Sequence, residues 1–208
     1  MANDLQTLKA KIADDLERSD MTNQIAATIT SSITFYADKP FWFLESEGTV
    51  DTVAETAYVA VPSGLRYAPR CDVEINLGGT LRVLRKLSWS EYRRRARIVT
   101  TSGEPTHYAY RTDRFYLHPK PQDVYTITAF GFYDEAALTA DTGDGSTNAW
   151  TDTARDLIAA DVVMRISRDV LRDPEREGNA RRAAEIAFSD LIRKGNARKG
   201  TGKVRGHL

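Results

Sequence analysis

The chain has 208 residues, of which 41% are hydrophobic and 28% charged, which is typical of one soluble globular domain or of two small ones. No apolar run reaches the roughly 18 residues of a membrane span, and the first residues, which include Asp4, lack the apolar segment of a secretory leader. Cys71 is the only cysteine, so an intrachain disulfide is excluded and we expect a protein made in a reducing compartment such as the cytoplasm, with no membrane partner.

The charges sum to zero but are unevenly distributed along the chain. Residues 1–60 contain ten acidic and four basic residues and carry a net charge of −6, which leaves +6 on the remainder. Two interpretations are open. The charges form ordinary solvated faces, or one end of the protein docks against the opposite end of a neighbouring copy.

Two helices are predicted in residues 1–40, as the first part of a helical body. Asn3 or Asp4 can cap the first helix, Ser19-Asp20 interrupts the pattern, and Pro40 ends the second helix. The apolar positions that recur at helical spacing are Leu5, Leu8, Ile12 and Leu16, then Ile25, Ile29, Ile33 and Tyr36. We expect an antiparallel helix pair with this stripe buried; a groove for a partner is the alternative.

Residues 41–140 are predicted to form an inserted antiparallel β domain. We expect the opening run Phe41-Trp42-Phe43-Leu44 to be buried where the helix pair meets a sheet, and an exposed interface patch is the alternative. Strand-like segments cover 50–53, 58–61, 73–77 and 81–84, and Gly78-Gly79 predicts a two-residue hairpin. Ser88 can cap a short helix over residues 89–98.

Residues 103–130 contain three aromatic, β-prone runs, separated by a charged turn at Thr112-Asp113 and by a connector with Pro119 and Pro121. This order predicts a three-stranded antiparallel meander whose prolines, which cannot donate to a ladder, mark the connector and an edge. A turn centred on Thr112-Asp113 places His107 opposite His118.

A basic cluster lies on the predicted short helix and consists of Arg93, Arg94, Arg95 and Arg97. Neighbouring helical residues fan out around the axis, so these side chains cannot all face one pocket. They are candidates for lining a channel, where they would screen DNA phosphates without sequence preference. The alternative is a solvated face with one or two salt bridges.

Two long helices are predicted in residues 148–193 and complete the helical body. Asn148 or Thr151 begins the first, and Asp173-Pro174 separates it from the second. The second has an apolar seam at Ala180, Ala183, Ala184, Ala187, Phe188, Leu191 and Ile192. We expect this seam to pack against a neighbouring subunit or against the preceding helix, at Leu157, Ile158, Val162 and Ile166. The predicted fold class is therefore α+β, a helical body with an inserted antiparallel β domain.

Residues 194–208 are predicted to be an extended, flexible basic tail. The positive charges at the end of the chain are Arg193, Lys194, Arg198, Lys199, Lys203 and Arg205. They alternate with glycines and with no acid, so the segment cannot bury a core. We expect it to be disordered alone and to be ordered by a partner, either DNA phosphates or an acidic protein surface.

The sequence contains little that indicates chemistry. It has no Walker loop, dinucleotide fingerprint, nucleophile elbow or Cys/His metal spacing, and the Asp/Gly loop at 141–147 lacks the closing glutamate of a calcium site. His107 and His118 could share a metal, but no third ligand is fixed by the sequence. Cys71 has no placed base. We expect no catalytic residue, no metal and no cofactor.

Several motifs occur in order along nearly the whole chain. The best defined are Gly-Glu-Pro-Thr-His-Tyr-Ala at 103–109, Leu-His-Pro-Lys-Pro at 117–121 and Tyr-Thr-Ile at 125–127. The others are 12–20, 36–43, the strand at 58–62, Trp150 and 171–174. Together they resemble the head-to-tail adaptor (connector) proteins of tailed bacteriophages. In the strand at 58–62, Val61 takes the place of the family's leucine.

The resemblance implies a structural virion protein rather than an enzyme, located in the neck between capsid portal and tail and made in the host cytoplasm. Such adaptors form a ring of about twelve copies around the channel for genome ejection, with the portal protein on one side and tail or nozzle proteins on the other. It also favours the portal as the partner that orders the basic tail, and implies nonspecific contact with packaged DNA. The alternatives are a stopper or terminator of the neck or tail, a nucleic-acid-binding protein and an unrecognised enzyme.

Overall fold

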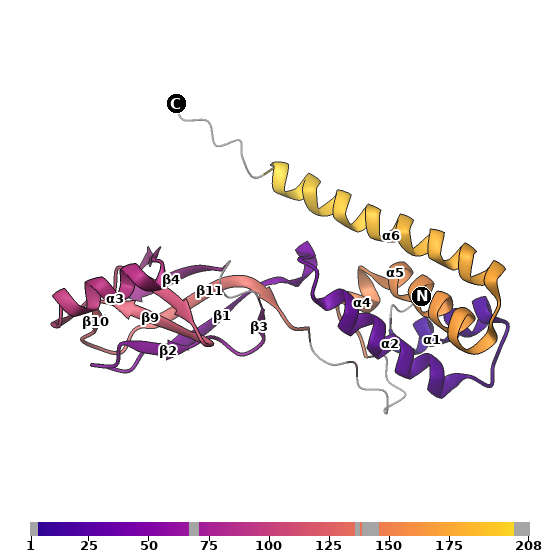
Figure 1. Ribbon diagram of the computed structural model, residues 1–208, viewed down its shortest axis with the longest axis horizontal. Helices are drawn as coiled ribbons and strands as arrows, with labels where there is room; N and C mark the ends of the chain where they lie inside the picture. The colour runs from indigo at the N-terminus through magenta and orange to yellow at the C-terminus, as the bar shows by residue number, and fades with distance from the viewer. Residues whose placement is uncertain (1–3, 67–70, 136–137, 139–145, 202–208) are drawn as a thin grey trace. The chain divides into compact units, whose positions relative to one another are not determined.

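The structure, a computed structural model, describes residues 4–66, 71–135, 138 and 146–201, without the side chains of 199–201. The chain divides into two compact units, and the fold is α+β, as predicted (Figure 1). The helical unit combines the two ends of the chain, Met1–Phe43 and Glu135–Leu208, whereas the β unit is the continuous segment Leu44–Asp134.

Helices α1 (Leu5–Leu16) and α2 (Thr22–Ala37) begin and end close to the predicted positions. Asp4 caps α1, because its Oδ1 accepts a hydrogen bond from the Thr7 amide at 2.7 Å while Thr7 Oγ1 accepts one from the Asp4 amide. The predicted apolar stripe is buried, except that Ile33 is half-buried. The stripe therefore contributes to the core of the helical unit.

The second part of the helical unit contains α4 (Ala149–Asp152), α5 (Arg155–Ile166), the π-helical segment η3 (Ser167–Leu171) and α6 (Pro174–Thr201). Asn148 caps α4, and Pro174 is the first residue of α6, where its missing N–H leaves no hydrogen bond unmade. Helices α5 and α6 pack against each other as expected. The seam is narrower than predicted, because Ala180, Ala184 and Leu191 are buried while Ala183 and Ile192 are exposed.

The aromatic run at residues 41–44 belongs largely to the helical core rather than to the β domain, where we had placed it. The short 3-10 helix η1 (Trp42–Leu44) follows Phe41. Phe41 is buried, and its ring meets those of Trp150 and Phe188 edge-on, at centroid distances of 5.9 and 5.7 Å. Edge-to-face aromatic packing thus joins the N-terminal part of the helical unit to α4 and α6.

The first sheet of the β unit has the order β1 (Glu45–Asp51), β11 (Thr126–Tyr133), β4 (Asp72–Leu77) and β5 (Thr80–Val83), with β3 (Leu65–Arg66) also paired to β11. All of these pairs are antiparallel. The predicted hairpin at Gly78-Gly79 joins β4 to β5. Both glycines have positive φ, +61° and +94°, which side chains with a Cβ disfavour.

The second sheet has the order β2 (Tyr58–Ala60), β9 (Arg114–His118), β8 (His107–Arg111) and β6 (Arg85–Lys86), with β6 parallel to β8. Two short strands, β7 (Ser102–Gly103) and β10 (Lys120–Pro121), pair with each other in parallel. Thr112 and Asp113 form the β8–β9 turn with positive φ. His107 faces His118, which confirms the predicted register.

The predicted three-stranded meander is wrong in its third strand. β8 and β9 form a hairpin, but β11 lies in the middle of the first sheet, and β2 occupies the other edge of β9. Pro119 and Pro121 lack the N–H that would continue a ladder beside β9. The carbonyl of Pro121 instead accepts a hydrogen bond from the Glu55 amide at 2.8 Å, and the chain crosses to the other sheet.

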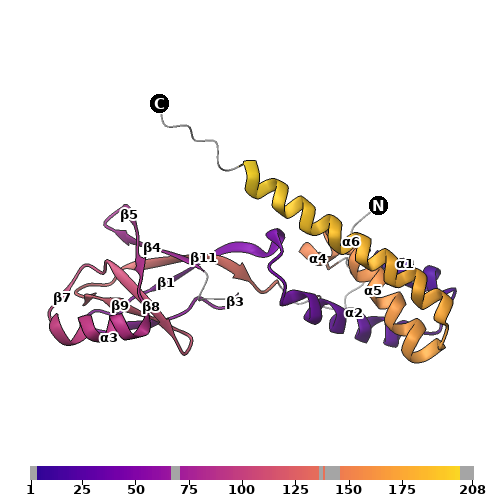
Figure 2. The ribbon, with the colours of Figure 1, turned by 45° about the horizontal axis from the view of Figure 1, so that its top comes forward.

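The two sheets face each other across an apolar core that includes Val73, Ile75, Tyr108, Phe115, Leu117, Ile127 and Ala129. Helix α3 (Trp89–Ile98) begins at the predicted cap, where Ser88 Oγ accepts from the Glu91 amide. It covers the other face of the second sheet, where Tyr92 of the helix joins a small apolar cluster with Leu87 and with Ala109 of β8. The layers are therefore first sheet, second sheet and α3, and Figure 2 shows α3 on the side away from β4 and β5.

Candidate assembly surfaces

The arginine cluster is divided by its position on α3. Arg93, Arg94 and Arg97 are exposed, whereas Arg95 is half-buried and forms an ion pair with Glu91 at 2.8 Å. Within the described ranges, no carboxylate pairs with Arg93, Arg94 or Arg97. The prediction that the four side chains fan out is confirmed, and three of them leave positive charge on the outer surface of the helix.

An aromatic platform fixes α3 to the second sheet. Trp89 and Tyr92, which are three residues apart and share a face of the helix, both contact the ring of Tyr116, at centroid distances of 4.8 and 5.6 Å. The guanidinium of Arg111 lies over Trp89 at 4.7 Å. Burial raises the pKa of Tyr92, with a further contribution from Tyr116. The arginines of α3 thus lie on a helix that aromatic contacts pack onto the second sheet.

The opposed histidines are engaged by protein groups. His107 Nδ1 lies 2.8 Å from Thr106 Oγ1, and its Nε2 lies 3.2 Å from a nitrogen of Arg95. His118 is buried, and its ring meets Tyr92 edge-on. Burial lowers the pKa of both imidazoles, and the charge of Arg95 lowers that of His107 further. In the described part of the chain, no three potential metal ligands come together.

The prediction of an extended tail from residue 194 is wrong for the described part of the C-terminal segment. Helix α6 continues through Thr201, and Gly195 is buried against Trp42, where a Cβ would come within 3.1 Å of the indole. The guanidinium of Arg198 lies 3.5 Å from the centre of the Trp42 ring. These contacts stabilise two helical turns that the composition alone does not predict.

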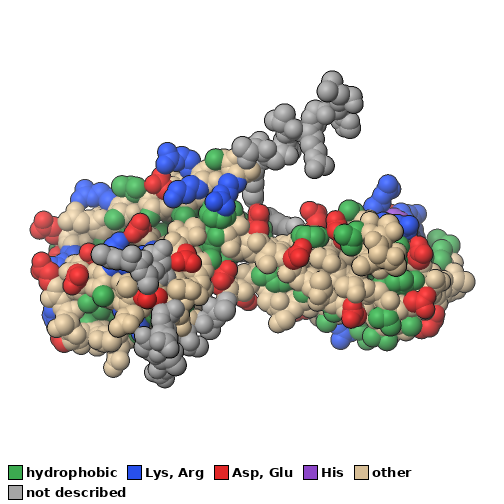
Figure 3. All heavy atoms as spheres, turned by 180° about the vertical axis from the view of Figure 1, so that it is seen from behind, with side chains coloured by type: hydrophobic (Ala, Val, Ile, Leu, Met, Phe, Trp, Pro, Cys, Tyr) green, Lys and Arg blue, Asp and Glu red, His purple; other side chains and the backbone are tan. Residues whose placement is uncertain are grey.

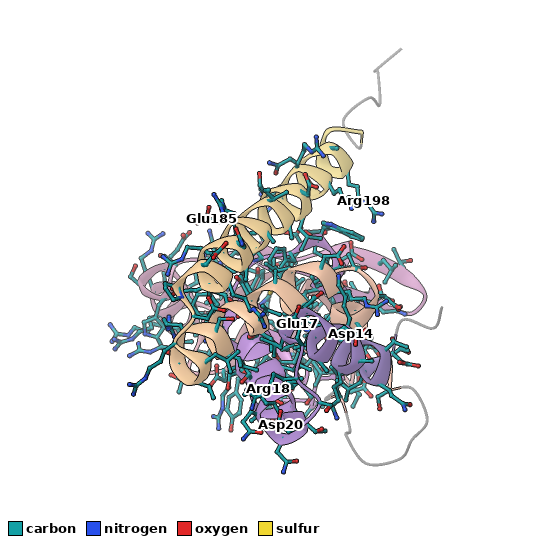
Figure 4. The ribbon with its side chains drawn as sticks, turned by 90° about the vertical axis from the view of Figure 1, so that its right-hand side faces the viewer. Asp14, Glu17, Arg18, Asp20, Glu185 and Arg198 are labelled. Carbon is teal, nitrogen blue, oxygen red and sulfur yellow. The ribbon has the colours of Figure 1, made fainter. Side chains whose placement is uncertain are left out.

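The six basic residues of the predicted tail differ in their structural environment. Arg193 and Lys194 are exposed, and Arg193 forms an ion pair with Asp190 at 3.0 Å. Figure 4 shows Arg198 towards the C-terminal end of α6 and Glu185 further back along the same helix. Lys199 lies in α6, whereas Lys203 and Arg205 fall outside the described residues. The helical segment therefore carries at least the first part of the basic surface.

A buried polar network in the helical unit was not foreseen. Asp161 is only 2% exposed, and it accepts hydrogen bonds from Ser32 Oγ and Arg165 Nε, both at 2.6 Å. The Tyr36 hydroxyl lies 3.4 Å from the same carboxylate, and burial together with Asp161 raises the pKa of Tyr36 to about 12. The sequence signal for this network was Asp161, a charged residue among the apolar positions of α5, together with Ser32, a polar residue inside the buried stripe of α2.

Charged contacts also close the turn that follows α1. Arg176 of α6 donates to the carbonyl of Leu16 at 2.5 Å, where α1 leaves carbonyls without helical partners. Arg18 donates to both carboxylate oxygens of Asp20 at 2.8 Å, and the two side chains lie side by side in Figure 4. The hydrogen bonds from Arg18 lower the pKa of Asp20 to about 2.

The sequence matches the family described as SU10 adaptor protein over residues 3–205, which is nearly the whole chain. The chain belongs to this family. A comparison with curated proteins gives no match. The family consists of phage head-to-tail adaptors, so the predicted resemblance is confirmed.

Membership gives this adaptor a structural role in the phage neck, where it interacts with other virion proteins. The family is one of structural proteins rather than enzymes. Burial raises the pKa of the Cys71 thiol to about 11, so it is a poor nucleophile at neutral pH. Among the described helices, none has the length and apolar character needed to cross a membrane.

Proposed function

We propose that this adaptor closes into a ring of about twelve copies that joins the portal to the tail, with the DNA channel at its centre. The observation that supports it is the family match together with the charged surfaces of the chain. Arg93, Arg94 and Arg97 carry charge that the described residues do not neutralise. Such surfaces are typical of proteins that function in an assembly, because each charge finds its partner in another molecule.

The proposed anchor to the portal is the basic end of the chain. Its residues are Arg193, Lys194, Arg198, Lys199, Lys203 and Arg205. In the helical segment, Arg193 and Lys194 point their charge to solvent. An acidic portal surface would pair with them, and tail or nozzle proteins would bind elsewhere on the ring during genome ejection.

The exposed arginines of α3 have two possible partners in such a ring. They screen the phosphates of DNA in the channel, which requires no sequence preference, or they pair with carboxylates of another protein subunit. In either role the isolated subunit binds DNA weakly. A steep fall of DNA affinity with salt in the isolated chain would instead support a nucleic-acid-binding protein.

Electron microscopy of the protein mixed with its portal tests the ring. We expect a closed ring of about twelve adaptor subunits on the portal, with an open central channel. An open filament, or a stable dimer bound to the portal, contradicts the proposal. A ring that binds tail proteins but does not bind the portal would indicate a stopper or terminator.

A pair of matched variants tests the anchor. We expect Arg193→Glu with Lys194→Glu to weaken portal binding at least about tenfold, because two attractive contacts become repulsive. The control is Arg181→Glu with Arg182→Glu, which makes the same charge change on α6 and also breaks one exposed ion pair. Equal loss of binding in both variants, or none in either, would show that the end of α6 is not the anchor.

A further inference from the structure

The first sheet has one face without a covering layer. Its inner face contributes Val73, Ile75, Ile127 and Ala129 to the core. Because side chains alternate along a strand, the intervening residues point to the other side. Among the described residues, no helix or strand is assigned to this outer face, whereas the second sheet is covered by α3.

The pairing register places acidic residues in neighbouring strands on this outer face. Glu47 of β1, Phe130 of β11 and Asp72 of β4 lie in one row, and Glu74 of β4 lies beside Val83 of β5 in the next. The carboxylates of the face are Glu45, Glu47, Asp51, Asp72 and Glu74. Arg66 of β3, opposite Phe132, also lies on this side and forms an ion pair with Asp134, so the face remains predominantly acidic. We call this surface the acidic sheet face.

Large apolar side chains are exposed between these carboxylates. Leu81 and Val83 are 62% and 63% exposed, and Phe130 is 38% exposed. A hollow of about 510 Å³ lies beside Phe130, with Glu47 and Asp72 among its lining residues. Figure 3 shows acidic and hydrophobic side chains interspersed on the visible face of the β unit. An exposed sheet surface of this composition is typical of a protein-binding site.

The opposite layer of the same unit has the complementary composition. The outer side of α3 presents Arg93, Arg94 and Arg97 together with Ile98, which is 75% exposed. We call this surface the basic helix face. Because the second sheet and the core lie between α3 and the first sheet, the two faces point away from each other on one unit.

We propose that the acidic sheet face of one copy of this chain binds the basic helix face of the next copy. Two different, complementary faces on opposite sides of one unit form a head-to-tail contact, which repeats from copy to copy and closes when the rotation permits. The inference rests on the proposed ring and assigns its subunit contact to these two surfaces.

The apolar residues favour a second copy over DNA as the partner of α3. Ile98 gains from burial against an apolar surface, which the phosphate backbone of DNA does not offer. The acidic sheet face repels DNA and requires a cationic protein partner. A second copy satisfies both faces at once, and the paired charges fix the register of the contact.

Charge reversal on each face provides the test. Variant A is Glu47→Lys, Asp72→Lys and Glu74→Lys; variant B is Arg93→Glu, Arg94→Glu and Arg97→Glu. Ring formation on the portal is measured by electron microscopy, and self-association of the full chain by sedimentation velocity at low salt. We expect each variant alone to associate at least about tenfold more weakly, since like charges then face each other.

Mixing the two variants separates a lost contact from a damaged fold. In an equimolar mixture, the reversed sheet face of A meets the reversed helix face of B, and the unreversed helix face of A meets the unreversed sheet face of B. Every contact then joins opposite charges, so we expect association to return to within about threefold of wild type. A misfolded variant would not recover on mixing. The control Asp123→Lys, Asp152→Lys and Glu185→Lys makes the same charge change at exposed acids that belong to neither face and should associate normally.

The outcomes distinguish this inference from the proposed ring. Normal rings from A and from B would overturn the inference and leave the ring intact. Loss of association in both without recovery in the mixture, with both variants folded by circular dichroism, would overturn it as well. If B lost only its affinity for DNA, the arginines would be channel residues. Failure of the wild-type chain to form rings, with and without portal, would overturn both.

Discussion

The β unit and the helical unit reach a defined structure by different means. The β unit is one continuous segment whose alternating residues bury an apolar core, and the hydroxyl of Tyr108 in that core donates to the Cys71 carbonyl at 2.9 Å. The helical unit joins the two chain ends around a buried carboxylate, Asp161, and a seam of small residues. The comparison teaches that a continuous apolar core stabilises the first unit, whereas the second also depends on a few individual polar and small side chains.

The largest expected loss of stability follows from removing an aromatic ring from the core of the β unit. Phe115 is fully buried, so Phe115→Ala should lower the stability of this unit by about 3–5 kcal/mol. Hydrogen exchange measured by mass spectrometry should show lost protection in peptides from 44–134 and unchanged protection in the helical unit. Val124→Ala, at a residue 65% exposed, is the control. Equal loss of protection in both units would contradict the view that the two units are stabilised separately.

The next effect concerns the buried carboxylate of the helical unit. Asp161→Ala leaves Ser32 and Arg165 without their buried acceptor and should cost about 3 kcal/mol, measured by urea unfolding. Asp169→Ala removes an exposed carboxylate that also pairs with an arginine and should leave the urea midpoint nearly unchanged. If the two variants were equally stable, the network would not be a determinant of the helical unit.

A smaller loss of stability is expected where α5 and α6 pack closely against each other. Ala184 is buried in the seam, so Ala184→Leu should overpack it and cost about 1–3 kcal/mol. Ala183→Leu, one residue along the same helix but exposed, should leave the melting temperature nearly unchanged. An unchanged melting temperature in the first variant as well would mean that the seam can open without cost.

The smallest effect is a pH dependence confined to the β unit. The pKa values of His107 and His118 are lowered in the fold, so the unfolded chain binds more protons and stability falls as the pH drops below about 6.5. Between pH 7.5 and 5.5 the melting temperature of this unit should decrease by about 2–4 °C. The variant His107→Gln with His118→Gln should lose this dependence, and a rise in melting temperature on acidification would contradict it.

Local features of the chain were predictable because they depend on neighbours in sequence. The caps at Asp4 and Ser88 follow from short polar side chains before helical periods, and the hairpin at Gly78-Gly79 follows from the freedom of glycine. The apolar stripes of α1 and α2 follow from the period of the helix. The motifs that resemble the adaptor family are local in the same sense, and the family match confirms them.

The features that could not be predicted depend on residues far apart in the chain. Trp42 stabilises the end of α6 through Gly195 and Arg198, although the composition of that segment predicts disorder. Asp161 is satisfied inside the core because Arg165 and also Ser32, which lies 129 residues earlier, donate to it. The sequence by itself determined the elements, the family and the presence of opposite charges. Only the tertiary structure decided that β11 enters the first sheet and that the acids and arginines occupy opposite outer layers, because strand pairing and burial are set by contacts between distant segments.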